Sequence, residues 1–249
     1  MTEENINVIT ANIKELTLSQ LVLNDFHAAE VLEKYHLDFC CNGNRLFYDV
    51  CKEKGLEHNA ILSEIENANK RNHELKFDLW ELDFLADYII NNHHQYVKQS
   101  GTIINEHIDK TAAVHGKNHP EIIEAAKLFS ICHKDLKQHM MKEETILFPY
   151  IKYLVKVKNG AASFEAPYFS TIRNPINMME AEHQSAGDIF VKIRELTNNF
   201  TLPSDACNTY KAAFEELNDF ELDLHKHIHL ENNILFPKAI EMEKEMLNK

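Results

Sequence analysis

The feature that most restricts how this chain can fold is an eleven-residue pattern, HxxxExxILFP, that occurs twice. The copies span residues 139–149 and 227–237. On an α-helix, residues four apart stand one above the other on the same face. The histidine and the glutamate of each copy therefore share a face, which the apolar Ile-Leu-Phe segment continues. The repeat predicts two equivalent helices that bury a polar pair in an apolar setting.

A buried histidine–glutamate pair on each of two helices points to a metal site. Helical bundles that hold two metal ions use carboxylate and imidazole ligands from facing helices. The candidates are His139 with Glu143, and His227 with Glu231. The alternative is an ordinary surface ion pair, which is the better interpretation of one isolated HxxxE. Two copies in matching apolar frames favour the metal site.

The rest of the chain predicts an all-α protein with two parts. Glycine and proline number only six each among 249 residues, which favours long helices over turn-rich β structure. We expect a small helical domain over 1–75 and a four-helix bundle over 76–249. In the bundle, one helix is expected over about 78–97, and helical structure is expected to resume after a break at Ser100-Gly101 and reach about 114. Further helices are expected over about 120–155, 175–196 and 203–246, with a long loop at about 154–172.

Charge and composition exclude several classes of protein. The net charge of −13 argues against a nucleic-acid-binding protein, which normally presents a basic face. No apolar run is long enough for a transmembrane helix, and the first ten residues do not resemble a signal peptide. Five cysteines in a chain of this size suggest a reducing compartment, so a cytoplasmic protein with no membrane association is expected.

The two histidine–glutamate pairs supply too few ligands for two metal ions, so other histidines are candidate ligands. His183 lies in mid-helix near the apolar side, whereas periodicity does not choose between His93 and His94. Residues about 200° around the helix from a ligand should point away from the site. This applies to His225 and His229, and to His133. The remaining candidates are His107, His115 and His119.

The adjacent Cys40 and Cys41 form a second motif, in the segment FCCNGN. Neighbouring Cα atoms are about 3.8 Å apart, below the usual range for a disulfide, so a bridge between them would be strained. A helix is expected over about 44–54, and its N-terminal dipole would favour thiolate. The pair is either a reactive thiol or transient iron ligand, or two small buried side chains. Cys51, Cys132 and Cys207 are expected to be ordinary helix residues.

With these motifs in place, the chain resembles the iron–sulfur cluster repair di-iron proteins (the RIC family, a hemerythrin-like group) over nearly its whole length. The segment from His36 to Gly43 resembles the DFCCxG signature of the family. The bundle segments DYIINNHH, AAVHG, HMMKEETILFP, MMEAEH and LENNILFP follow in the family's order. The loop at 154–172 is longer than in the family and lies away from every ligand position.

The resemblance implies two iron ions joined by an oxo or hydroxo bridge. It selects His94 over His93 and makes Glu143 and Glu231 the bridging carboxylates. With five histidines, these ligands would leave one coordination position open for a small molecule such as nitric oxide or dioxygen. Zinc or manganese could use the same atoms, so iron rests on the resemblance. The implied ligands are His94, His115, His139, Glu143, His183, His227 and Glu231.

One of these ligands depends on a bend in the chain. His94 and His115 are 21 residues apart, which is roughly 31 Å along a continuous helix. They can share a site only if the chain turns between them, and Ser100-Gly101 is the expected place. If residues 82–116 form one straight helix, His115 is not a ligand.

The resemblance implies repair of iron–sulfur clusters damaged by nitrosative or oxidative stress, with damaged iron–sulfur proteins as partners. In that interpretation the di-iron site supplies iron, and Cys40 and Cys41 assist the transfer. Two alternatives remain open: an enzyme that reduces nitric oxide to nitrous oxide, and a dioxygen-binding or sensing protein. A homodimer, in which the cysteine loop of one chain serves its partner's site, is an arrangement that the sequence leaves open.

Overall fold

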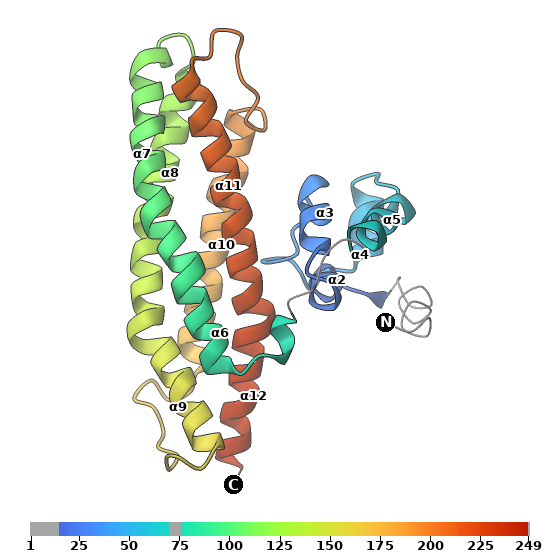
Figure 1. Ribbon diagram of the computed structural model, residues 1–249, viewed down its shortest axis with the longest axis vertical. Helices are drawn as coiled ribbons and strands as arrows, with labels where there is room; N and C mark the ends of the chain where they lie inside the picture. Colours follow the sequence, from blue (N-terminus) through green and yellow to red (C-terminus); the bar gives the residue numbers. More distant parts are fainter. Residues whose placement is uncertain (1–14, 70–75, 249) are drawn as a thin grey trace. The chain divides into compact units, whose positions relative to one another are not determined.

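The structure, a computed structural model, describes residues 15–69 and 76–248. The first ten residues, which are not expected to form a signal peptide, lie outside the described residues. The predicted domain boundary after residue 75 lies at the edge of the second described range. Within the described residues every regular element is helical, apart from an isolated bridge between Thr17 and Leu46 (Figure 1). This confirms the prediction of an all-α protein. No helix in the described parts of the chain is long and apolar enough to cross a membrane.

By their contacts, the residues form two compact units. The first comprises residues up to Trp80 together with Ile228–Ile234, and the second comprises Glu81–His227 and Leu235–Lys249. Residues 228–234 are also the covalent continuation of a bundle helix.

The first unit is built from short helices. They are α2 (Leu18–Asn24), α3 (Ala28–Lys34), α4 (Phe47–Glu53), α5 (His58–Asn69) and the 3₁₀ turn η2 (Phe77–Leu79). The Thr17 side chain accepts a hydrogen bond from the Gln20 N–H, and the Gln20 side chain accepts one from the Thr17 N–H. These two bonds form a capping box at the start of α2. Gly55 adopts a left-handed φ of 66° just beyond α4, where the sequence places a helix end.

The second unit, together with residues 228–234, is a bundle of four long helical rods. The first rod is α6 (Leu82–Ile89), η3 (Ile90–His94) and α7 (Gln95–His115); the second is α8 (Pro120–Lys142), η4 (Glu143–Leu147) and α9 (Phe148–Lys158); the third is α10 (Arg173–Leu196); the fourth is α11 (Asn208–Leu230), η5 (Glu231–Leu235) and α12 (Phe236–Leu247). In Figure 1, α8 lies beside both α7 and α10, and these helices are in contact. Their apolar faces enclose a core that includes Phe129, Phe190 and Phe220.

Three of the four rods contain a π-helical turn, η3, η4 and η5. Each turn holds a candidate ligand: His94, Glu143 or Glu231. Such turns occur often at functional sites because they re-aim the side chains around them. The prolines of the two repeats follow the turns, as the second residues of α9 and α12. Both rods continue through these prolines, since the first turn of a helix tolerates proline.

The predicted break at Ser100-Gly101 is wrong, because α7 runs through both residues. Gly101 serves packing rather than chain reversal. A Cβ atom at this position would lie 2.4 Å from Cδ2 of the buried His133 ring. The missing side chain thus lets α8 approach α7.

Gly101→Ala is expected to destabilise the protein, although alanine is intrinsically better in a helix by about 1 kcal/mol. The added methyl group overlaps a buried ring, and overpacking of this kind costs about 1–3 kcal/mol. The free energy of unfolding by urea measures the effect. In a His133→Ala background the same change should be neutral or stabilising; equal losses in both backgrounds would show that the ring is not the cause.

Candidate metal centre

Two groups of potential metal ligands lie in the bundle. The first contains His94 and His227 and the second contains His139 and His183, and both groups include Glu143 and Glu231. In each group the ligand atoms lie within 4.8 Å of one another. The two groups therefore share both carboxylates, and each could hold a metal ion.

All six side chains are buried. None is more than 2 % exposed, and His94, Glu143 and Glu231 are at 0 %. Burying carboxylates is costly unless positive charge accompanies them. A cation in each group would supply that charge. Four imidazole nitrogens and two carboxylates also form a donor set that suits a first-row transition metal rather than calcium or magnesium. The residues present therefore fit a metal centre.

Two further glutamates orient the imidazoles. Nδ1 of His94 lies 2.8 Å from Oε1 of Glu144, and Nδ1 of His139 lies 2.9 Å from Oε2 of Glu182. An ionised carboxylate can only accept, so each Nδ1–H donates and Nε2 is left for the centre. The Nε2 atoms lie 3.4 Å and 3.3 Å from Oε2 of Glu143.

Both orienting glutamates are themselves held by lysines. Lys98 binds Glu144 and Lys142 binds Glu182. The hydrogen bond from His139, together with Lys142 and against the effect of burial, lowers the pKa of Glu182 to about 2. Burial works to raise the pKa of Glu144, but Lys98 and His94 outweigh it and lower that pKa. Sequence reasoning missed both glutamates, although each is adjacent to a candidate ligand in the chain.

The phenylalanine of each repeat packs against a histidine of the centre. The Phe148 ring stacks on His94 with centroids 5.6 Å apart, and the Phe236 ring stacks on His183 at 6.1 Å. Each repeat thus supplies ligands from its own helix and an aromatic ring that packs against an imidazole from another rod. This explains why the two copies share the apolar residues as well as the ligands.

His115 is the implied ligand that the structure does not bring to the centre. The first rod is continuous from Leu82 to His115, which is the condition that excludes His115. Its Nε2 instead lies 3.3 Å from Sγ of Cys207, and its ring lies 5.3 Å from that of Tyr210. We therefore remove His115 from the ligand set, because a straight helix separates it from His94 by roughly 31 Å.

The other histidines take separate roles. His93, the neighbour of His94, is buried and its Nδ1 lies 2.9 Å from Asp223. His133 lies 2.8 Å from the Asn105 amide, in line with the expectation that it points away from the site. His107 pairs with Glu216, and His119 pairs with Asp205 and Glu121.

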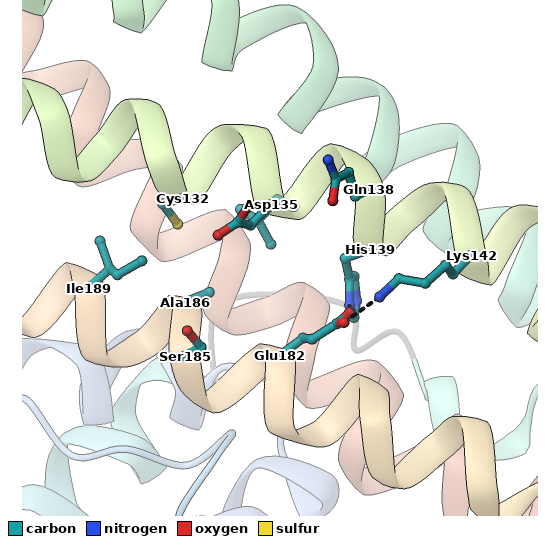
Figure 2. A pocket seen from close by; sticks show the side chains of 10 residues that line it. Cys132, Asp135, Gln138, His139, Lys142, Glu182, Ser185, Ala186 and Ile189 are labelled. Carbon is teal, nitrogen blue, oxygen red and sulfur yellow. Dashed lines mark hydrogen bonds and ion pairs between the residues drawn. The ribbon is translucent and has the colours of Figure 1, made fainter.

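A pocket of about 180 Å³ lies between α8 and α10 beside the centre. Figure 2 shows His139 at its edge, with Glu182 and Lys142 reaching across from the two facing helices. Cys132, Ser185 and Ala186 also line it. The volume suits a few water molecules or a diatomic gas, so the pocket offers small molecules a route to His139.

Glu182→Gln is expected to weaken metal binding about 10–100-fold, the usual effect of removing a partner that orients a metal-binding histidine. The glutamine amide can either accept from or donate to Nδ1 of His139. It therefore no longer fixes the tautomer of the imidazole. Competition with a chelator of known affinity measures the loss. Glu180→Gln, an exposed change on the same helix, is the control, and similar affinities for the two variants would contradict the role of Glu182.

The cysteine pair lies in the loop between α3 and α4 of the first unit. Cys40 is buried, Cys41 is half-buried, and no disulfide joins the described cysteines. The hydrogen bond with Cys41, burial, and the negative charges of Cys41 and Asp38 raise the pKa of Cys40 well above its ordinary value. The expectation that the following helix dipole favours a Cys40 thiolate is therefore wrong, because nearer negative groups dominate.

Cys207 also differs from its expected role. Helix α11 begins at Asn208, so Cys207 precedes the helix and is exposed. The backbone N–H of Tyr210, the side chain of His115 and the backbone N–H of Thr209 together outweigh the opposing effect of burial. They lower the pKa of Cys207 from its ordinary value of 9.0 to about 7. The thiolate is the nucleophilic form of cysteine.

The rate of Cys207 alkylation by iodoacetamide should therefore rise with pH and reach half its maximum at about pH 7. His115→Ala should move that midpoint to higher pH, since it removes one of the groups that stabilise the thiolate. Mass spectrometry of the labelled peptide follows the reaction, with the buried Cys51 and Cys132 as internal controls. A midpoint unchanged by His115→Ala would contradict the contact.

The geometry can be compared with known proteins. The family described as hemerythrin HHE cation binding domain matches residues 85–239, and a domain of unknown function, ScdA_N (DUF542), matches residues 14–69. The chain is 32 % identical to the iron–sulfur cluster repair protein YtfE of Enterobacter sp. (strain 638) over 235 residues, which cover 91 % of this chain and 97 % of that protein. It is also 32 % identical to the YtfE proteins of Citrobacter koseri, over 92 % of this chain and 98 % of that protein, and of Escherichia coli O81, over 91 % and 97 %.

These matches confirm the resemblance drawn from the motifs. They cover both the segment that contains the cysteine pair and the bundle with its two ligand groups. A hemerythrin HHE cation-binding domain implies that the bundle binds metal. The chain belongs to the hemerythrin-like family of iron–sulfur cluster repair proteins.

Proposed function

We propose that this protein repairs damaged iron–sulfur clusters in the cytoplasm by donating iron from a di-iron centre in the bundle. The observation that carries the proposal is the pair of ligand groups that share Glu143 and Glu231. Relatives that match nearly the whole chain are named iron–sulfur cluster repair proteins. The partners of this function are proteins whose clusters have been damaged by nitric oxide or oxidants.

The ligands we assign to the two irons are those of the two buried groups: His94, His139, Glu143, His183, His227 and Glu231. When bound, the metal pair supplies iron for transfer and a place for small ligands. Without His115, the bound metal would have one more open coordination position than the ligand set implied by the resemblance. A less saturated metal would be released more readily, as a donor requires.

The repair assay uses an enzyme whose [4Fe–4S] cluster has been damaged by nitric oxide. The iron-loaded protein should restore its activity faster and more fully than the same amount of ferrous salt. The Glu143→Ala variant, loaded in the same way, should do no better than the salt. Restoration by the wild-type protein that never exceeds that by the salt would refute the proposal.

Nitric oxide reduction is the second candidate, and the pocket beside His139 is the observation that favours it. Gas analysis of the reduced protein with nitric oxide decides between the two functions. Catalytic formation of nitrous oxide would support a reductase, whereas a stable nitrosyl adduct without turnover would leave repair as the function.

A further inference from the structure

The loop between α3 and α4 holds a third group of potential ligands, separate in kind from the bundle centre. It consists of Asp38, Cys40 and Cys41, whose ligand atoms lie within 4.8 Å of one another. Sγ of Cys40 lies 3.2 Å from Oδ1 of Asp38 and 3.9 Å from Sγ of Cys41. Two sulfur atoms and a carboxylate oxygen thus face a common point.

The loop is fixed in this form by its own backbone. Oδ1 of Asp38 accepts hydrogen bonds from the N–H groups of Cys40 at 3.0 Å and Cys41 at 2.9 Å. A Cβ atom on Gly43 would lie 2.2 Å from the Phe39 carbonyl oxygen, so only glycine permits the turn. The Gly43 carbonyl then accepts from the Ser19 N–H at the start of α2. These hydrogen bonds therefore hold the three potential ligands close together before any cation binds.

The surroundings favour a positive charge at this point. Among the described residues, no lysine or arginine forms an ion pair with Asp38, whose hydrogen bonds come from the backbone, the Cys40 thiol and Asn42. Ionisation of the thiols would add negative charge beside this carboxylate. A divalent cation would offset that repulsion, and sulfur ligands select a thiophilic one.

Accessibility distinguishes this group from the buried centre. Asp38 is exposed and Cys41 is half-buried, whereas Cys40 is buried. Structural zinc sites are closed by four protein ligands, while sites that exchange their ligands keep a position open. A group of three protein ligands at the surface matches the sites that keep a position open.

We propose that Asp38, Cys40 and Cys41 form a second cation site that binds a thiophilic divalent cation such as ferrous iron, with Asp38 as its oxygen ligand. Binding breaks two S–H bonds, forms two metal–sulfur bonds and releases two protons to the solvent, with no change of oxidation state. Binding itself does not depend on the repair function. A role for this site in passing iron onward rests on the proposed function.

The test uses the full chain, freed of metal by a chelator and kept reduced, with Cys51, Cys132 and Cys207 replaced by alanine. Cobalt(II) is the probe, because thiolate ligation gives a near-ultraviolet charge-transfer band that histidine and glutamate ligands do not. We expect this band to saturate with the release of two protons for each cobalt ion bound to sulfur. Cys40→Ser or Cys41→Ser should weaken or abolish it.

Asp38→Asn is the decisive variant. Asparagine keeps an oxygen that can accept from the Cys40 and Cys41 N–H groups, so the loop is preserved while the anionic ligand is lost. The affinity for cobalt, measured by the band, should fall about tenfold or more. Asp49→Asn, an exposed change in the same unit, is the matched control, and circular dichroism verifies folding.

Absence of the band would overturn the site, and equal affinities of the Asp38→Asn and Asp49→Asn variants would overturn Asp38 as a ligand. Both readouts are independent of cluster repair. A failed repair assay with an intact cobalt band would count against the proposed function alone.

Discussion

Glu143→Ala is expected to empty the metal centre of the bundle. Glu143 belongs to both ligand groups and is fully buried, so its loss removes a potential ligand from both groups at once. Metal analysis after purification should find close to none of the metal that the wild-type protein binds. The unfolding temperature of the purified variant should fall to that of the metal-free wild-type protein or near it, since a ligand that binds only the folded state stabilises it.

The same variant should behave differently once metal is removed from both proteins. In the metal-free wild type, Glu143 is a fully buried carboxylate beside His94 and His139. Because the burial of a carboxylate is costly, its replacement by alanine should lower the stability of the metal-free protein far less than the loss of metal lowers that of the loaded protein. Glu124→Ala on α8, where the side chain is exposed, should change neither metal content nor stability. Retention of the full metal content by the Glu143→Ala variant would refute the bridging role.

Phe236→Ala is expected to lower the free energy of unfolding by about 3–5 kcal/mol. The ring is fully buried and stacks on His183, so its removal leaves a cavity in the core and loosens a ligand. Denaturant unfolding of the metal-free proteins isolates the packing effect from metal binding. A chelator competition on the metal-loaded proteins should then show weaker binding by the variant.

Phe84→Ala is the matched control for this change, because Phe84 is 58 % exposed. A substitution on the surface should alter stability by no more than about 0.5 kcal/mol. A loss of less than 1 kcal/mol in the Phe236→Ala variant would mean that the core closes around the gap and that the stacking is unimportant.

The repeat carried most of what the sequence could predict about the fold and the site. Its spacing gives a helical face, and its duplication singles out His139, Glu143, His227 and Glu231. The structure places all four in the two ligand groups. Periodicity worked here because ligands and core residues share one face of one helix, which is a local property of the chain.

Contacts between helices were beyond that kind of reasoning. In the sequence, Ser100-Gly101 suggests a break in the helix, yet Gly101 is the position where α7 contacts His133 of α8. The error about the break and the implied position of His115 are linked, since only a bend would have brought His115 back. A glycine needed for close packing cannot be told from one needed for a turn until its neighbour is known.

The cysteines show the same limit in their electrostatics. The helix that follows Cys40 was expected to stabilise its thiolate, but Asp38 and Cys41 lie closer and raise its pKa. Cys207, expected to be an ordinary helix residue, precedes α11 and meets His115 from α7. Distances of 3–4 Å decide such effects, and the sequence does not contain them.

The sequence by itself determined the all-α class, the repeated ligand pairs and the family, because these depend on the order and spacing of residues along the chain. The resemblance implied that His94 and His183 join the centre and that the two glutamates are shared. Only the tertiary structure decided that His115 lies away from the centre and that Glu144 and Glu182 orient the imidazoles. These features join residues from different rods. Their geometry follows from the packing of one helix against another, which no single segment encodes.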